Sequence, residues 1–83
     1  MEEKMSVKEG EYCGFQTLIE EPGVLIVTFD RPESLNASTA PMKRDLVEVL
    51  IQTQMDDAIR VVIFTGKGSA FWAGDDLKGY SGE

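Results

Sequence analysis

The residues best suited to chemistry follow one short apolar stretch. Val61 to Thr65 is a run without polar alternation, which is typical of a parallel strand buried on both faces. The next nine residues contain three glycines: Gly66, Gly68 and Gly74. Open α/β sheets bind ligands at the carboxyl ends of such strands, where glycines let the backbone come close to the ligand. We therefore predict a binding site near residues 66–78.

Other patterns in this region favour structural roles. The segment Gly66-Lys67-Gly68-Ser69 lacks the Gly-x-x-x-x-Gly-Lys-Ser/Thr spacing of a P-loop. Asp75 and Asp76 have no third ligand at a recognisable spacing, so we interpret them as loop caps and predict no metal site. Trp72 is expected to pack rather than to stack on a substrate.

Composition excludes several classes of partner. Asp and Glu outnumber Lys and Arg by 15 to 8 and no basic patch forms, so we expect no nucleic-acid partner. The longest apolar runs, such as Val24 to Val27, have four residues, which is too short for a membrane span. Cys13 is the only cysteine and no histidine is present to activate it, which indicates an inert thiol in a reducing compartment. Without a recognisable signal peptide or presequence, we expect a cytoplasmic chain, and a targeting signal outside these residues stays open.

A hairpin is expected to precede the site. Phe15 to Glu20 and Val24 to Phe29 flank Glu21-Pro22-Gly23, which predicts a turn with proline second and glycine third. The later segment is apolar on both faces and is expected to be central, which makes the earlier one the edge strand. Residues 1–14 are charged and without apolar periodicity. We interpret them as a flexible leader, with regular structure beginning near Phe15.

A helix is predicted after the hairpin. Ser38 or Thr39 can cap it, and Pro41 suits its first turn. Apolar residues recur at helical spacing and are expected to face the core: Met42, Leu46, Val49 and Leu50. Asp45 and Glu48 are expected on the solvated face and not as a catalytic pair.

The predicted helix runs from Met42 to about Met55 and ends near Asp56. It connects the segments Val24 to Phe29 and Val61 to Thr65, and such a connection gives parallel strands with a right-handed crossover. The fold class is therefore α/β: a β-hairpin followed by a right-handed βαβ unit.

Three blocks of sequence, in this order, resemble one family. They are Gly23 to Ala37 with its Arg-Pro-x-x-x-Asn-Ala motif, Val61 to Gly66, and Ser69 to Lys78 with its Ala-Phe-x-Ala-Gly-x-Asp-Leu motif. Together they resemble the opening third of the crotonase superfamily, the enoyl-CoA hydratase and isomerase enzymes. The resemblance covers about Phe15 to Lys78. It implies the N-terminal part of a crotonase-like (ClpP/crotonase) fold, with residues 15–83 as a truncated domain.

The resemblance also implies roles for the matching residues. In the family, the backbone N–H after the motif glycine is one of two oxyanion donors, which assigns that catalytic role to Asp75. Arg31 and Leu35 fall in a connection that borders the CoA. Main-chain groups of the second motif are implied to contact the CoA and the thioester: Ala73, Gly74, Asp75, Asp76 and Leu77. The family position of Asp75 is usually small or uncharged, but a main-chain donor does not depend on the side chain.

The implied ligand is an acyl-CoA thioester, with CoA as part of the substrate and no separate cofactor. The second oxyanion donor and the acid/base glutamates of the family fall outside these 83 residues. We therefore expect an acyl-CoA-binding segment of an enoyl-CoA hydratase/isomerase-like protein that is inactive alone, and its status as an enzyme stays open. One alternative is a truncated, non-catalytic isoform that acts as an interaction module for full-length relatives, and another is a fragment that does not fold alone. Hydratase against isomerase activity, acyl length, and homo-oligomer against association with relatives also stay open.

Overall fold

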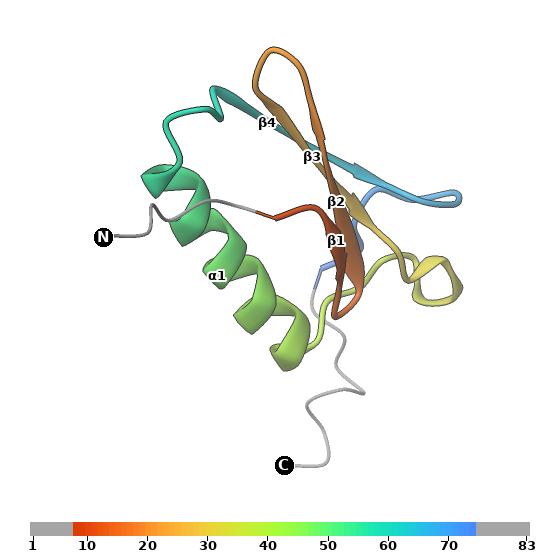
Figure 1. The fold of residues 1–83 in the computed structure, drawn as a ribbon. Coiled ribbons are helices and arrows are strands. Elements are labelled where there is room, and N and C mark those ends of the chain that lie inside the picture. Colours follow the sequence, from red (N-terminus) through yellow and green to blue (C-terminus); the bar gives the residue numbers. More distant parts are fainter. Residues whose placement is uncertain (1–7, 75–83) are drawn as a thin grey trace.

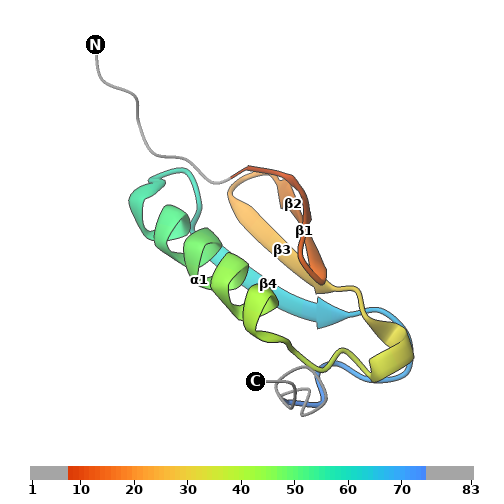
Figure 2. The ribbon, with the colours of Figure 1, turned by 90° about the horizontal axis from the view of Figure 1, so that it is seen from below.

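The fold consists of one sheet with a helix along one face (Figures 1 and 2). The structure is a computed structural model and describes residues 8–74. Its four strands lie in the order β1-β2-β3-β4, with bounds Gly10–Tyr12, Phe15–Glu20, Val24–Phe29 and Val61–Gly66. β1, β2 and β3 pair antiparallel, whereas β3 and β4 are parallel. A short 3-10 helix, η1 (Pro32–Ser34), and the helix α1 (Ala40–Met55) connect β3 to β4, which confirms the predicted α/β hairpin and strand–helix–strand order.

Regular structure begins before the predicted onset at Phe15. β1 pairs with β2 so that Tyr12 lies opposite Phe15, and the two rings stack with centroids 5.0 Å apart. Gly10 N–H also donates to Thr17 Oγ1 at 3.1 Å. β1 is thus the edge strand in place of β2, and the prediction of the edge was wrong. A strand of three residues is too short to show a periodic pattern, so β1 could not be predicted from hydrophobic periodicity.

The turn between β2 and β3 is present, but its positions differ by one from the prediction. Gly23 N–H donates to Glu20 O at 3.0 Å, which makes Pro22 the third and Gly23 the fourth residue of the turn. The Gly23 carbonyl accepts hydrogen bonds from Arg60 N–H at 2.7 Å and Val61 N–H at 3.2 Å. A Cβ on Gly23 would collide with the backbone carbonyl of Ala58. The glycine therefore permits the close approach of the segment that enters β4.

The core lies between β3 and α1. Alternate residues of β3 are buried, and they pack with residues of β2 and α1: Phe15, Leu25, Val27, Phe29, Met42 and Val49. This confirms the central position predicted for β3. β4 departs from its prediction as a strand buried on both faces, because Val61 and Ile63 are 50% and 47% exposed. Within residues 8–74, β4 pairs with β3 alone, so its other edge is uncovered.

α1 agrees with its predicted bounds. Thr39 rather than Ser38 is the N-cap, and its Oγ1 accepts a hydrogen bond from Met42 N–H at 3.3 Å. Pro41 lies in the first turn, and Asp56 caps the C-terminus. Thr39 therefore resolves the alternative that the sequence left open.

Two side chains of α1 behave differently from the prediction. Leu50 is 36% exposed and does not belong to the buried core formed by Met42 and Val49. Asp45 accepts a hydrogen bond from Cys13 N–H at 3.0 Å, so it is not simply a solvated residue. Both differences depend on which neighbour the helix meets, and periodicity alone does not show this.

Across residues 8–74, no helix combines the length and the apolar character that crossing a membrane requires. The same residues contain no group of three or more His, Cys, Asp or Glu side chains placed to hold a metal ion.

Candidate functional site

The candidate site is built from two loops that leave the same edge of the sheet. One is the connection 31–38, which follows β3, and the other is the loop 67–74, which follows β4. Because β3 and β4 are parallel, both loops begin at the carboxyl ends of adjacent strands (Figure 1). This is the edge at which open α/β sheets bind ligands.

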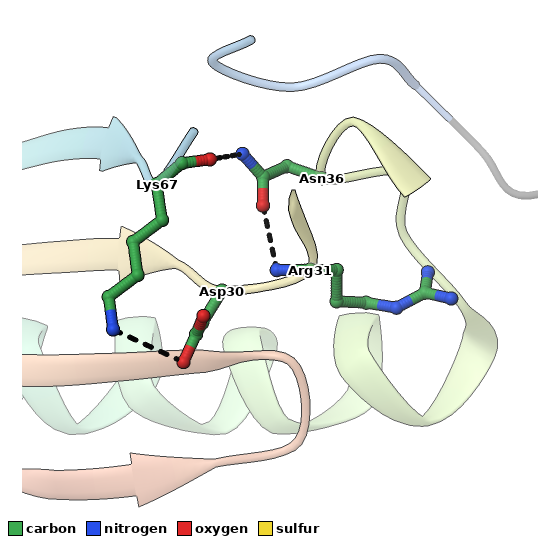
Figure 3. Close-up of polar contacts among 4 residues, drawn as sticks. All are labelled: Asp30, Arg31, Asn36 and Lys67. Atoms are coloured by element: carbon green, nitrogen blue, oxygen red, sulfur yellow. Dashed lines mark hydrogen bonds and ion pairs between the residues drawn. The ribbon is translucent and has the colours of Figure 1, made fainter. Parts of the chain in front are cut away.

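Asn36 joins the two loops. Its Nδ2 donates to Lys67 O at 2.9 Å and to Ala70 O at 2.7 Å, while its Oδ1 accepts from Arg31 N–H at 2.7 Å. Figure 3 shows this carboxamide between Lys67 and Arg31. Asn36 is fully buried, so without these hydrogen bonds its own carboxamide would be left unpaired away from water, which is costly. One side chain thus fixes the loops relative to each other.

The backbone at Asn36 also suits an asparagine. Leu35 and Asn36 have φ of 53° and 59°, in the left-handed region. Asparagine tolerates this conformation better than most residues, because its short polar side chain bonds nearby backbone groups. Leu35, by contrast, has an apolar side chain that is 49% exposed and cannot make such hydrogen bonds.

Gly66, at the end of β4, is enclosed by the loop that follows it. A Cβ at this position would lie 2.5 Å from Phe71 O, 2.8 Å from Ala70 O and 2.7 Å from Asn36 Nδ2. Two of these three atoms are backbone, which cannot move aside like the end of a flexible side chain. The sequence predicted that glycines here allow a ligand to approach the backbone. At Gly66, the missing side chain instead makes room for the chain's own loop.

Ser38 holds the far end of the loop. Its N–H donates to Gly74 O at 2.7 Å, and its hydroxyl lies 3.4 Å from the same oxygen. Ser38 is buried, with 3% of its surface exposed. Gly74 has a φ of 97°, which favours glycine. Together, Asn36 and Ser38 bind three carbonyls of the loop 67–74.

Arg31 braces its own connection. Its Nη1 donates to Ala37 O, and its Nη2 lies 3.5 Å from Ser34 Oγ. Asp30 and Lys67 form an ion pair at 3.5 Å beside it (Figure 3). Because Asp30 and Lys67 are 41% and 49% exposed, that pair contributes little stability.

An apolar pocket of about 280 Å³ lies next to the loop, between α1 and the ends of β3 and β4. Ser38 and Lys43 contribute to its lining, together with six apolar side chains: Phe29, Met42, Leu46, Phe64, Phe71 and Trp72. Within this lining, the ring of Phe29 contacts two other aromatic rings. Its centroid lies 5.6 Å from that of Phe71 and 6.5 Å from that of Trp72. Trp72 packs on Phe29 and remains 49% exposed. Its expected packing role in place of stacking on a substrate stays a prediction.

The predicted site residues fall into two groups. Arg31, Leu35, Ala73 and Gly74 lie in the two loops. Asp75, Asp76 and Leu77 lie outside the described residues. Asn36 and Ser38 were not predicted as site residues, although Asn36 stands in the Arg-Pro-x-x-x-Asn-Ala motif. A motif asparagine beside a predicted strand end was the signal for a loop-bridging carboxamide.

Comparison with known proteins identifies the family. A family model described as enoyl-CoA hydratase/isomerase matches residues 20–83. The hydroxycinnamoyl-CoA hydratase-lyase of Pseudomonas fluorescens is 38% identical over 76 residues, which are 92% of this chain and 27% of that protein. The 1,2-epoxyphenylacetyl-CoA isomerase of Escherichia coli is 46% identical over 57 residues, which are 69% of this chain and 22% of that protein.

A solved structure shows the same relationship. The crystal structure of enoyl-CoA hydratase from Mycobacterium tuberculosis H37Rv matches with a TM-score of 0.79 and 35% identity. The match covers 86% of this chain and 32% of that one. The chain thus spans a minor part of the length of each of these relatives. On the family match and these likenesses, the chain belongs to the enoyl-CoA hydratase/isomerase family of the crotonase superfamily.

Proposed function

We propose that this chain supplies an acyl-CoA-binding segment of an enoyl-CoA hydratase/isomerase-type site. In this proposal, the backbone N–H of Asp75 donates to the thioester oxygen, and the main chain from Ala73 to Leu77 lies along the CoA thioester. CoA is part of the substrate, and no separate cofactor is needed. The observation that carries the proposal is the buried Asn36, which fixes the loop leading to this donor.

Preorganisation is the reason this observation matters. An enolate oxygen that develops on a thioester is stabilised by donors already in place, and losing one such donor typically costs about 10²- to 10³-fold in rate. The loop 67–74 is bonded at Lys67 O, Ala70 O and Gly74 O. Hydrogen bonds therefore hold the loop in place as far as Gly74, the residue before the proposed donor.

The surroundings of the loop support an acyl thioester as the ligand. The adjoining pocket of about 280 Å³ is lined mainly by apolar side chains, which suit an acyl group. The hydratase-lyase of Pseudomonas fluorescens and the isomerase of Escherichia coli are both named after an acyl-CoA. By the family resemblance, the second oxyanion donor and the acid/base glutamates are not among these residues. We therefore propose that the 83-residue chain binds an acyl-CoA but does not turn it over.

A fluorescence titration tests binding. Trp72 is the only tryptophan and lines the pocket, so saturable binding of butyryl-CoA should change its emission. Asn36→Ala should weaken the response strongly, whereas Gln54→Ala, the same kind of truncation at an exposed position, should not. An emission that ignores butyryl-CoA would contradict the proposal. Hydration of crotonyl-CoA by the 83-residue chain would contradict its inactivity.

A second candidate function is an interaction module for full-length relatives, and the uncovered edge of β4 favours it. Val61, Ile63 and Phe64 are 50%, 47% and 38% exposed on this edge. Open apolar edges recruit further strands. Light scattering with and without a full-length relative tests this function. A compact monomer that binds no relative would rule it out.

A further inference from the structure

We propose that the apolar pocket beside the loop 67–74 selects acyl-CoA thioesters whose acyl group carries an aromatic ring. This inference rests on the function proposed above and names the class of acyl group. The composition of the pocket wall carries it, because half of the eight described residues that line the pocket are aromatic. These are Phe29, Phe64, Phe71 and Trp72.

Three of these rings retain free surface. Phe29 is buried, and its ring centroid lies 5.6 to 6.5 Å from the centroids of the other three rings. Phe64, Phe71 and Trp72 are nevertheless 38%, 51% and 49% exposed. Aromatic rings attract one another in offset-stacked or edge-to-face contacts, in addition to the burial of apolar surface. A ring on the ligand can therefore extend this cluster, whereas a saturated chain gains burial alone.

The pocket has the size of a ring with a short linker. Its volume is about 280 Å³, whereas an apolar cavity of about 150 Å³ already binds benzene. The remaining space suits a short chain that joins the ring to the thioester. A ring also has fewer torsions to fix on binding than a linear chain with the same number of carbons, which favours the ring.

The loop that carries residues 71 and 72 is held on both sides of their rings. Before them, Asn36 Nδ2 donates to Ala70 O at 2.7 Å. After them, Ser38 N–H donates to Gly74 O at 2.7 Å. A wall that is in place before the ligand arrives loses little freedom on binding and can discriminate between ligand shapes.

The pocket wall also differs in charge from the rest of the chain. The chain contains 15 Asp and Glu residues, but none is among the eight described residues that line the pocket. Lys43 is the charged residue in this wall. An anionic ligand such as a CoA thioester therefore meets no carboxylate at the pocket wall that would repel it.

This inference gives Trp72 a second role. The sequence led us to expect that Trp72 packs in place of stacking on a substrate, and its ring does pack on Phe29. Because Trp72 also lines the pocket and is half exposed, a ring bound there would contact it as well.

Isothermal titration calorimetry of the 83-residue chain with three ligands tests the inference. The ligands are 3-phenylpropanoyl-CoA, 3-cyclohexylpropanoyl-CoA and nonanoyl-CoA, which have the same number of acyl carbons. Hydrophobic burial alone would favour the two saturated groups. We expect the phenyl compound to bind about threefold more tightly than the cyclohexyl compound, because ring contacts add to burial.

Variants of the pocket rings locate this preference. Phe71→Leu should remove most of it, and Phe71→Tyr, which keeps a ring, should retain it. Phe64→Leu repeats the test on β4. Tyr12→Leu is the matched control, because the Tyr12 ring stacks on Phe15 outside the pocket and its loss should leave the preference unchanged.

Two methionines of α1 report where the ring binds. Met42 lines the pocket, whereas Met55 lies at the other end of the helix and is 55% exposed. In NMR spectra of the chain labelled with [methyl-¹³C]methionine, the ring current of the bound phenyl group should shift the Met42 methyl resonance. The Met55 resonance should not move, and the cyclohexyl compound should shift Met42 much less.

The outcomes distinguish the two proposals. If all three compounds bind more tightly than CoA alone but without a preference for the phenyl group, the inference fails and the proposed function stands. A preference that survives in both Leu variants of the pocket, or a Met42 resonance that does not move, would also overturn the inference, because the ring would then bind elsewhere. If no acyl-CoA binds more tightly than CoA alone, the proposed function itself fails.

Discussion

β3 and β4 have similar sequences but very different surroundings. They are parallel and pair residue by residue, so that Val27 lies beside Phe64. Val27 is fully buried, whereas Phe64 is 38% exposed. β3 has a strand on each side, but β4 has one strand neighbour within residues 8–74. An apolar strand is thus buried by its neighbours and not by its own composition.

β4 also differs along its own length. Its body, from Val61 to Phe64, is largely exposed, whereas Gly66 is enclosed by loop backbone and Asn36. The candidate site therefore depends on the end of β4 more than on its body. Substitutions along β3 and β4 can test this contrast.

Gly66→Ala should give the largest loss of stability. A Cβ at this position meets two backbone carbonyls within 2.8 Å, and we expect a loss of about 3 kcal/mol in the free energy of unfolding. Urea denaturation measures it. Gly10→Ala is the control, because a Cβ there meets no atom within 4 Å, and its positive φ should cost about 1 kcal/mol. Equal losses in the two variants would show that Gly66 is not sterically enclosed.

Val27→Ala and Val61→Ala make the same change on the two strands. Val27 is fully buried and Val61 is 50% exposed. We expect Val27→Ala to cost about 2 kcal/mol and Val61→Ala less than about 0.5 kcal/mol. Thermal unfolding of both variants measures the difference. A similar cost at both positions would show that the two strands do not differ in how deeply their side chains are buried.

Thr39→Ala tests the helix that covers β3. The Thr39 hydroxyl caps Met42 N–H, and removing an N-cap typically costs about 1 kcal/mol. Circular dichroism during urea denaturation should show a lower midpoint. Thr65→Ala, at an exposed position of β4, is the matched control and should leave the midpoint almost unchanged. If the two variants behave alike, the cap contributes nothing.

Ile63→Lys should have the smallest effect on stability, within about 0.5 kcal/mol, because a lysine at an exposed edge remains solvated. It should reduce self-association at high concentration, since a charge opposes strand pairing at that edge. Sedimentation velocity measures association. Val47→Lys, at a 56% exposed position of α1, is the control and should leave association unchanged. Self-association equal in both variants would place the contact elsewhere.

Local sequence signals predicted much of the fold. The Glu21-Pro22-Gly23 turn predicted the hairpin, and the helical spacing after Thr39 predicted α1 and its end near Asp56. Signals of this kind act within a few residues. β1 and the exposure of β4 were missed, because a three-residue strand shows no period and strand burial depends on distant neighbours.

The site was predicted less completely for the same reason. The glycines pointed to the loop after β4, but the role of Gly66 depends on Asn36, which is thirty positions earlier in the chain. The hydrogen bonds from Asn36 and Ser38 are contacts between two loops that only the parallel pairing of β3 and β4 brings together. Spacing in the sequence does not encode such contacts.

Two-dimensional ¹H–¹⁵N NMR of the 83-residue chain during titration with butyryl-CoA observes the proposed oxyanion donor itself. If the Asp75 N–H donates to the thioester oxygen as proposed, its amide resonance should move saturably with butyryl-CoA and much less with S-butyl-CoA, the thioether that lacks the carbonyl. An Asp75 resonance that stays unchanged, or that responds equally to both ligands, would contradict the account.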